Sequence, residues 1–371
     1  MSKIKELINQ LCPYGVKFIR LGDYIKVLRG RRLTTRDVIE DGEFPVYHGG
    51  IIPIGMYDKS NRKANTTMII NVGASAGSVA YSNVDFWSSD GCFCLEQTDM
   101  YDNRFLYHLI MTFENQLKSK VRRAGIPTLD NKVIENLTIP VPPIEVQREI
   151  AHILDDFMLL STELSEELKA RQQQYDYYKN TLLSKVQGKE YKLGDVTNFK
   201  TGSKPKEILD AEEYEYINAG TTNSGYSSEF NMDGDKVTTP SRGAGGIGFV
   251  GYQKKDFWLG PLCYAIWSKD EKILINKYLY YELSSKKDEI LKRKNTGGVP
   301  SLNGCDLKTI PINIPTIDEQ IRIVNILDKF EKICEDYNEG LPAEIDARNK
   351  QYEFYRNVLL TFKELKVNEV Q

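Results

Sequence analysis

The residues of this sequence that could do chemistry are mostly cationic, and their spacing favours phosphate contact over catalysis. The cluster Arg29-Gly30-Arg31-Arg32, with Arg36 soon after it, has a counterpart in Lys200, Lys204 and Lys206. Such turn-rich cationic loops bind phosphate oxygens, although a solvated turn has the same composition. Phe18 to Lys26 alternates between apolar and polar residues and should form a strand. Because the cationic loop occurs twice, each time just after the first strand of its repeat, we interpret it as a phosphate-contact loop.

Two polar segments carry side chains that could read the edges of nucleic-acid bases. The first contains Tyr47 and His48, and the second contains Asn218, Thr221 and Asn223. Amides and hydroxyls hydrogen bond to base edges, but they also form turns. We favour base reading, because each segment joins strand-forming residues to a flexible polar tip.

Cationic residues also gather near the ends of two predicted helices, over 101–121 and 276–292. They are Lys118, Arg122, Arg123, Lys292 and Arg293, and Arg242 lies in a glycine-rich stretch between the two helices. A cationic helix end complements the helix dipole, which is a sufficient structural explanation. Repetition of the pattern makes these residues a second candidate for contact with a nucleic-acid backbone.

Catalytic and metal-binding patterns are absent from the sequence. The three histidines, His48, His108 and His152, do not have the spacing of metal ligands, and the six cysteines form no CxxC pair. No Walker or dinucleotide-binding glycine loop, Gly-x-Ser-x-Gly elbow or HExxH motif occurs. The net charge of -3 also excludes a generally basic surface. We expect no catalysis and no metal site in this chain.

Long helices must position these residues. Apolar residues recur every three or four positions in two stretches of roughly forty residues, each long enough for a rod of about 60 Å. The stripe residues are Leu154, Phe157, Leu164, Leu168, Tyr175, Tyr178 and Leu182, then Leu327, Phe330, Tyr337, Ile345, Tyr352, Tyr355 and Leu359. Because neither rod can bury its stripe alone, we expect an antiparallel coiled coil.

The sequence is a tandem duplication. Gly125-Ile126-Pro127-Thr128-Leu129 returns as Gly298-Val299-Pro300-Ser301-Leu302, and the long stretches match with four extra residues near Asn338-Glu339-Gly340-Leu341-Pro342. Glycine and proline oppose helix continuation, so the second rod should break or kink there. The predicted fold class is α+β, with two mixed α/β domains joined by two long helices in a pseudo-two-fold repeat.

The repeat also predicts domain boundaries. We expect an N-terminal helical arm at 1–19, a first recognition domain at 20–143, a first long helix at 144–187, a second recognition domain at 188–316, a second long helix at 317–366 and a tail at 367–371. No apolar run approaches the length of a membrane span, and the first residues lack a signal-peptide core. A cytoplasmic protein with reduced thiols is expected.

Three stretches resemble the specificity subunit of type I restriction-modification systems. They are Leu11 to Tyr24, Gly125 to Phe157, and Gly340 through Tyr355 with Arg348, Gln351 and Tyr352. The order of parts is similar over nearly the whole chain. The resemblance implies two target-recognition domains that each read half of an asymmetric, bipartite site in double-stranded DNA. The half-sites would lie about one helical turn apart, ~34 to 36 Å.

The resemblance also implies partners. The long helices would set the spacer and dock two adenine methyltransferase subunits, and restriction subunits would complete the complex. S-adenosylmethionine would bind the methyltransferase, which flips the adenine out of the duplex, while ATP and Mg would bind the restriction subunit. This chain lacks a DPPY-type methylation motif. Two alternatives stay open: an orphan or decoy subunit, and a coiled-coil adaptor whose heads bind a partner other than DNA.

Overall fold

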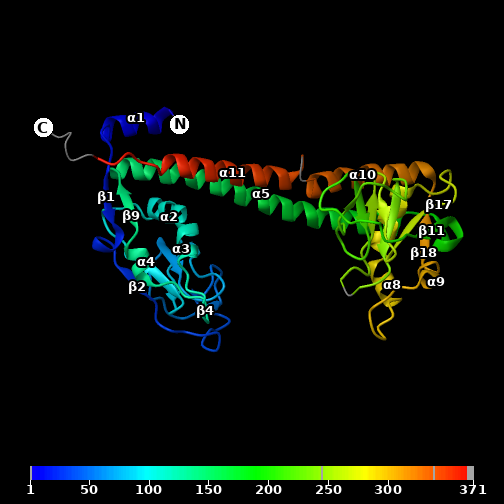
Figure 1. The fold of residues 1–371 in the computed structure, drawn as a ribbon, viewed down its shortest axis with the longest axis horizontal. Helices are drawn as coiled ribbons and strands as arrows, with labels where there is room; N and C mark the ends of the chain where they lie inside the picture. Colours follow the sequence, from blue (N-terminus) through cyan, green and yellow to red (C-terminus); the bar gives the residue numbers. More distant parts are fainter. Residues whose placement is uncertain (1, 244, 337–338, 366–371) are drawn as a thin grey trace. The chain divides into compact units, whose positions relative to one another are not determined.

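The computed structural model describes residues 2–243, 245–336 and 339–365. The chain divides into two units. Unit 1 comprises Met1–Leu164 and Ile345–Gln371, and unit 2 comprises Ser165–Glu344. Each unit therefore contains a mixed α/β domain together with parts of two long helices that are far apart in the sequence (Figure 1).

The elements of unit 1 begin with a short helix and a strand. They are α1 (Ser2–Leu11), β1 (Lys17–Arg20), a 3-10 turn (Leu21–Asp23), β2 (Val27–Arg29), β3 (Phe44–Tyr47), β4 (Gly55–Tyr57), β5 (Thr66–Ile70), β6 (Val79–Ser82), β7 (Trp87–Ser88), β8 (Cys92–Leu95), α2 (Asn103–Thr112), α3 (Glu114–Ser119), α4 (Asn131–Glu135) and β9 (Thr138–Val141). The long helix α5 (Ile144–Lys185) follows and continues into unit 2.

Unit 2 repeats this order of elements. They are β10 (Lys189–Lys192), α6 (Leu193–Val196), β11 (Thr197–Thr201), β12 (Tyr214–Ile217), β13 (Tyr226–Ser227), β14 (Lys236–Pro240), β15 (Gly251–Gln253), β16 (Trp258–Leu259), β17 (Cys263–Ser268), α7 (Asn276–Ser285), α8 (Lys287–Lys292), α9 (Gly304–Leu307), β18 (Pro311–Ile314) and α10 (Ile317–Glu335). The last helix, α11 (Leu341–Leu359), lies almost wholly in unit 1.

The sheets of the two units have the same topology. A four-stranded antiparallel sheet has the order β2-β8-β5-β6 in unit 1 and β11-β17-β14-β15 in unit 2. A three-stranded mixed sheet has the order β4-β3-β7 or β13-β12-β16, in which β3 and β12 each pair with a parallel neighbour. The pairs β1-β9 and β10-β18 complete each unit. The duplication predicted from the sequence is thus confirmed in the fold.

Burial explains the central strands. All five residues of β5, Thr66–Ile70, are buried, as its β-branched and apolar sequence requires of a strand covered on both faces. Helix α2 covers this sheet through Phe105 and Leu109. The core of unit 2 is built in the same way around Ile266 and Tyr278.

The long helices pack antiparallel within each unit. In unit 1, Ser161 of α5 bonds to Asn349 of α11, whereas Phe157, one turn earlier in α5, stacks on Tyr355, further along α11, at 5.0 Å between ring centroids. In unit 2, Tyr178 of α5 stacks on Phe330 of α10 at 5.4 Å. The pairing runs in opposite directions along the helices, as the sequence predicts.

The second long helix differs from the expected single span of 317–366. Helix α10 ends at Glu335 and α11 begins at Leu341 and ends at Leu359. The predicted break near Gly340 and Pro342 is therefore confirmed, although Asn338 and the stripe residue Tyr337 lie outside the described residues. Proline at the second helical position fits a helix start, because its missing N–H would have no intrahelical partner there.

Two other expectations need correction. The strand expected from Phe18 to Lys26 ends at Arg20, because Leu21-Gly22-Asp23 turns back and is held by a bond from the Leu21 N–H to the Leu137 carbonyl at 2.8 Å. The arm expected to be helical over residues 1–19 is helical only over Ser2–Leu11 and already enters β1 at Lys17. The alternation of apolar and polar residues from Phe18 to Lys26 did not distinguish one long strand from a short strand followed by a turn.

Candidate nucleic-acid interface

The cationic loop of unit 1 is fastened to strands β7 and β8 by its backbone. The Gly30 N–H donates to the Cys92 carbonyl at 3.2 Å and the Arg31 N–H to the Ser88 carbonyl at 2.9 Å. The indole Nε1 of Trp87 donates to the Arg31 carbonyl at 2.9 Å. These bonds fix the backbone, while the side chains of Arg29, Arg31 and Arg32 stay exposed.

Unit 2 fastens its cationic loop in the same way. Gly202 N–H donates to the Gly260 carbonyl and Ser203 N–H to the Leu259 carbonyl, both at 3.1 Å. Trp258 Nε1 donates to the Ser203 carbonyl at 2.8 Å. The two loops, which sequence comparison paired by charge alone, therefore occupy equivalent places. Lys200, Lys204 and Lys206 are exposed in unit 2.

Glycine is required where each loop crosses the strand. A Cβ atom on Gly30 would lie 2.0 Å from the Ser89 carbonyl oxygen, and a Cβ on Gly202 would lie 1.7 Å from the Leu259 carbonyl oxygen. No side chain fits at such distances, so the backbone contact selects glycine. The repeated glycine within a cationic run was a signal of this crossing that charge reasoning did not use.

The polar tip of unit 1 lies next to its cationic loop. His48 Nδ1 lies 3.0 Å from Ser89 Oγ, and Ser89 Oγ in turn bonds to the N–H and the carbonyl of Leu33. Gly91 packs so closely on Gly49 N that a Cβ would come within 2.6 Å. Ser89 thus connects the tip to the loop that carries Arg31 and Arg32.

The tip of unit 2 uses an amide in the place of His48. Asn218 Oδ1 accepts from the Leu262 N–H at 2.9 Å, and a Cβ on Gly260 would lie 2.5 Å from the same oxygen. Thr221 is exposed beyond this bond, and Asn223 is half-buried. Asn218 is partly committed to holding its own loop, which leaves its Nδ2 group as the hydrogen-bond donor available to a ligand.

The glycine-rich loop of each unit, around Gly73 or Gly243, bonds to the Gly-x-Pro-x-Leu turn. In unit 1 the Gly73 N–H donates to the Pro127 carbonyl at 3.0 Å, and the Leu129 N–H donates to the Asn71 carbonyl at 2.8 Å. In unit 2 Gly243 bonds to Pro300 and Leu302 to Ser241 at 3.0 and 2.8 Å. The repeated Gly-x-Pro-x-Leu turn is therefore seated on the glycine-rich loop of its own unit.

The predicted contact residues divide by exposure. Those with exposed side chains are Arg29, Arg31, Arg32, Arg36, Lys118, Arg122, Arg123, Lys200, Lys204, Lys206, Thr221, Arg242 and Lys292. Those that are half-buried are Tyr47, His48, Asn218, Asn223 and Arg293. The fold therefore leaves the cations available, whereas the tips are only partly accessible.

Some predicted contact residues also have internal partners. Lys118 pairs with Glu114 one turn earlier, and Arg293 Nη1 donates to the Glu289 carbonyl at 2.9 Å. Tyr47 packs its ring against Phe86 in an edge-on contact with centroids 5.5 Å apart. Two aromatic pairs recur in the repeat, Phe86-Trp87 and Phe257-Trp258. Phe86, Trp87 and Phe257 are buried, but Trp258 is only half-buried.

A half-buried ion pair around the buried His108, which sequence reasoning missed, fixes the domain of unit 1 to its long helices. Asp155 of α5 accepts from Arg104 Nε at 3.0 Å and from His108 Nε2 at 2.8 Å, and His108 Nδ1 lies 3.0 Å from the hydroxyl of Tyr352 on α11. Arg104 also lies over the Tyr81 ring at 4.4 Å. The cluster joins three helices that sequence spacing does not relate.

Protonation follows from this geometry. Burial alone would raise the pKa of Asp155, but the bonds from His108 and Arg104 outweigh it and lower the pKa to about 2. Burial lowers the pKa of His108. We infer that a neutral His108 donates from Nε2 to Asp155 and accepts at Nδ1 from the Tyr352 hydroxyl.

Unit 2 has the equivalent cluster with different residues. Lys277 replaces Arg104, and its Nζ lies 2.7 Å from Glu331 and 3.3 Å from Asp328. The same ammonium lies over the Tyr252 and Tyr280 rings at 4.5 and 4.7 Å. A cation from the domain and a carboxylate from the long helix are thus retained in both units.

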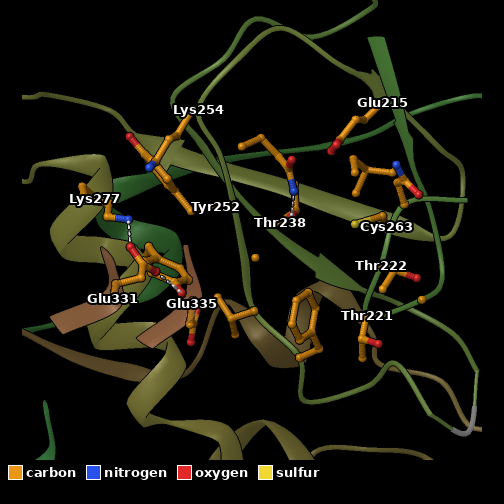
Figure 2. A pocket seen from close by; sticks show the side chains of 18 of the residues that line it. Glu215, Thr221, Thr222, Thr238, Tyr252, Lys254, Cys263, Lys277, Glu331 and Glu335 are labelled. Atoms are coloured by element: carbon orange, nitrogen blue, oxygen red, sulfur yellow. Dashed lines mark hydrogen bonds and ion pairs between the residues drawn. The ribbon is translucent and has the colours of Figure 1, made fainter. Parts of the chain in front are cut away.

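This cluster forms one end of an open cleft in unit 2. The cleft has a volume of about 1130 Å³ and contains the ion pair of Lys277 with Glu331 at one side and Thr221 and Thr222 at the other (Figure 2). Its wall from α10 carries carboxylates, Glu335 among them. Because these groups repel phosphates, a nucleic-acid backbone would not run along this wall.

Most predicted stripe residues serve internal packing. Leu154, Leu327 and Leu359 are buried at 0%, 0% and 5% exposure, and Tyr175 is buried at 7%. Partly buried are Phe157, Leu164, Leu168, Leu182, Phe330, Ile345, Tyr352 and Tyr355. Tyr178 is 39% exposed. Exposed aromatic residues that the stripe did not include are Tyr177 and Phe354, at 64% and 62%.

Comparison with known proteins identifies the class. The family model for the type I restriction modification DNA specificity domain matches residues 13–171 and 185–347, one match in each repeat. The chain belongs to this family, and its two α/β domains are DNA-recognition domains of a type I restriction-modification system. The family supplies DNA specificity to such systems and not catalysis.

Several relatives share most of the chain. A putative type I restriction enzyme specificity subunit of Haemophilus influenzae is 32% identical over 313 residues, with 77% of this chain and 79% of the relative covered. A putative type I specificity subunit of Mycoplasma pneumoniae is 28% identical, with 94% and 98% covered. The EcoR124I/EcoR124II specificity subunit of Escherichia coli is 30% identical, with 71% and 73% covered.

Solved structures share the fold. The S subunit of a type I restriction-modification system from M. genitalium has a TM-score of 0.69 at 20% identity, with 93% of this chain and 96% of that chain covered. A chain from a structure on complex assembly and conformational transition of the type I R-M system has a TM-score of 0.51 at 17% identity, with 93% and 96% covered. No described helix is long and apolar enough to cross a membrane.

Proposed function

We propose that this chain reads an asymmetric, bipartite site in double-stranded DNA, one half with each unit, and directs methyltransferase and restriction subunits to it. The observation that carries the proposal is a shared framework with different tips. Both units hold a cationic loop against a strand through glycine and tryptophan, while His48 in one tip corresponds to Asn218 in the other. Equivalent frameworks with unlike readers fit two unlike half-sites.

In this proposal the cationic loops contact phosphates, and the polar tips read bases. Backbone bonds fix the loops, so the loop backbone loses little conformational freedom on binding, and only the exposed arginine and lysine side chains must be ordered. Arg31 and Arg32 give one loop its charge in unit 1, and Lys204 and Lys206 do so in unit 2. Phosphate contacts would set the register of each unit on the duplex, and base contacts would set the sequence.

The exposed aromatic residues of the long helices support a partner present in two copies. Tyr177 of α5 and Phe354 of α11 occupy equivalent positions of the repeat, 177 residues apart, and both are more than half exposed. Exposed aromatic residues are typical anchors of protein interfaces. We assign the two positions to two methyltransferase subunits.

Cofactors belong to the partners in this proposal. S-adenosylmethionine would be held by the methyltransferase, and ATP and Mg by the restriction subunit. In the described ranges, no group of three or more His, Cys, Asp or Glu residues is placed to hold a metal ion. The complex would act in the cytoplasm, where it meets both host and incoming DNA.

The decisive experiment maps methylated adenines in the native host with and without the gene, combined with capture of partners by the tagged chain. Loss of methylation at one bipartite motif, with recovery of a methyltransferase, is the expected result and gives the target directly. Unchanged methylation without a recovered methyltransferase would overturn the proposal and favour an orphan subunit or an adaptor with other ligands.

The phosphate role has its own test on the identified duplex. The double variant Arg31→Ala, Arg32→Ala should bind every sequence more weakly, and two lost phosphate contacts should reduce the slope of log K against log salt by about 2. Lys5→Ala, which removes an exposed cation from helix α1, is the control. A loss of affinity restricted to one base sequence would contradict the phosphate assignment.

A further inference from the structure

Each unit projects one exposed aliphatic side chain from its Gly-x-Pro-x-Leu turn. Ile126 is 71% exposed in unit 1, and Val299 is 75% exposed in unit 2. The two residues stand 173 positions apart, at the same place of the repeat. Neither contributes to a core, so the apolar character at this position is not explained by folding.

The turn that carries Ile126 is rigidly built. The N–H of Arg122 donates to the Thr128 carbonyl at 2.9 Å, and the Thr128 N–H donates back at 3.0 Å. The Thr128 hydroxyl also donates to the carbonyl of Ile126 at 2.9 Å. Because the glycine-rich loop holds the next residue, Pro127, the Gly-x-Pro-x-Leu turn is a fixed projection and not a loose loop.

The turn of unit 2 is built in the same way. Asn295 N–H donates to the Ser301 carbonyl at 2.8 Å, and Ser301 N–H donates back at 3.1 Å. Gly125 and Gly298, which precede the exposed residues, have φ values of 87° and 120°, and a Cβ on either would meet nothing within 4 Å. Both Gly-x-Pro-x-Leu turns therefore face open space, and their glycines have a backbone conformation that glycine favours.

Charge identifies the occupant of that space. Arg122 and Arg123 precede the turn of unit 1, and Lys292 and Lys294 precede the turn of unit 2. Cations close in sequence to a single exposed apolar side chain suit the polyanionic backbone and apolar base faces of DNA. A β-branched side chain on a fixed turn also has few rotamers to lose on insertion.

Duplication indicates what the two Gly-x-Pro-x-Leu turns do. Residues that read sequence should differ between the units, as His48 and Asn218 do, whereas a residue type kept in both should serve a step common to both half-sites. In the proposed complex that step is base extrusion, because a methyltransferase must take its target out of the stack. Extrusion leaves an apolar gap and costs a few kcal/mol in lost stacking.

We propose that Ile126 and Val299 are apolar wedges that enter the DNA stack, one in each half-site, and fill the space left by the extruded base. The inference rests on the proposed function. The wedge would exclude water from the gap and stabilise the extruded state, as apolar side chains inserted at base steps do in other DNA complexes. It assigns the two turns a binding role separate from base reading.

The test uses the complex with its methyltransferase and a duplex of the mapped target. The duplex carries 2-aminopurine in place of the target adenine of one half-site, because this base fluoresces more strongly when it is unstacked. Ile126→Ala should lower the fluorescence increase about tenfold at the half-site read by unit 1 and leave the other unchanged. Val299→Ala should do the reverse, and Ile126→Val should retain most of the signal.

Val84→Ala is the matched control, because Val84 is also an exposed aliphatic residue of unit 1, at 49% exposure, in a different loop. Equal signals for Ile126→Ala and the wild type would overturn the wedge while leaving the proposed function intact, and so would an equal loss at both half-sites. A wild-type complex that binds the duplex without raising its fluorescence would overturn the wedge alone, whereas a wild-type complex that fails to bind the duplex would overturn the proposed function and the wedge with it.

Discussion

Replacement of Gly30 by alanine is expected to detach the cationic loop of unit 1 from strand β7. The new Cβ would lie 2.0 Å from the Ser89 carbonyl oxygen and 2.3 Å from that of Ser88, both backbone atoms of the strand region. Carbon–oxygen contacts below about 3 Å are strongly repulsive. The loop must therefore move by about 1 Å, which is more than its hydrogen bonds tolerate.

The expected loss follows from the bonds that this movement breaks. They are the bonds from Gly30 N–H to Cys92, from Arg31 N–H to Ser88 and from Trp87 Nε1 to the Arg31 carbonyl. At about 1 kcal/mol each, their loss lowers the free energy of unfolding of unit 1 by about 3 kcal/mol. DNA affinity should fall as well, because the arginines are no longer held in place.

Urea titration gives the change in unfolding free energy, and amide hydrogen exchange shows where protection is lost. Gly202→Ala should produce the same loss in unit 2, since its Cβ would lie 1.7 Å from the Leu259 carbonyl oxygen. Gly245→Ala, with nothing within 4 Å of the added Cβ, should cost less than 1 kcal/mol. Wild-type stability in Gly30→Ala, or loss of protection away from β7, would refute the reasoning.

Three further predictions concern the long helices. Gln147→Leu should lower the free energy of unfolding of unit 1 by about 3 kcal/mol in urea titrations, and Gln320→Leu should do the same in unit 2. Each glutamine makes three backbone bonds of 2.8 to 3.0 Å, which leucine cannot make. Additive losses in the double variant would confirm separate roles. Asp155→Asn should weaken the dependence of the unfolding free energy on pH at acid pH. The lowered pKa of Asp155 gives stability above pH ~4 that disappears as pH falls towards 2, and asparagine does not titrate. An unchanged pH dependence in the variant would contradict this. Tyr177→Ala and Phe354→Ala should each halve the number of methyltransferase subunits bound, measured by native mass spectrometry, with no loss of stability.

Much of the architecture could be predicted because it is encoded locally. The duplication is visible as matching motifs, the long helices as a stripe of period three to four, and the helix break as Gly340 and Pro342. Each of these signals depends on neighbouring residues or on a constant offset. The strand expected over 18–26 was wrong for the same reason, since alternation reports a local pattern and not where a chain turns.

The ionic clusters could not be predicted because they depend on tertiary contact. Arg104, His108 and Asp155 lie on two helices about fifty residues apart, and Tyr352 comes from the far end of the chain. One signal was present: Asp155 returns as Asp328 at the common offset of the repeat. A carboxylate kept beside the apolar stripe of both helices indicates a cation packed against it, but it does not say which cation.

The roles of the candidate contact residues also exceed what sequence gives. Charge and repetition located the two cationic loops, and the fold adds that Trp87 and Trp258 hold them through equivalent bonds. It further shows that the side-chain oxygen of Asn218 accepts a hydrogen bond from the Leu262 N–H and is therefore not available to a base. Which bases the tips read depends on docked geometry, which neither charge nor exposure encodes.

The duplication separates what must stay constant from what can change. Two contacts that join each domain to the long helices recur in both units: a glutamine at the helix start and a carboxylate facing a cation of the domain. Glycine and tryptophan recur beneath the cationic loop. The tips differ: His48 and Asn218 each make a bond to the framework, whereas Thr221 and Thr222 of the second tip are exposed. Changes at the exposed positions of a tip therefore cost little stability, and a new half-site can be acquired without disturbing the helices that the proposed partners would bind.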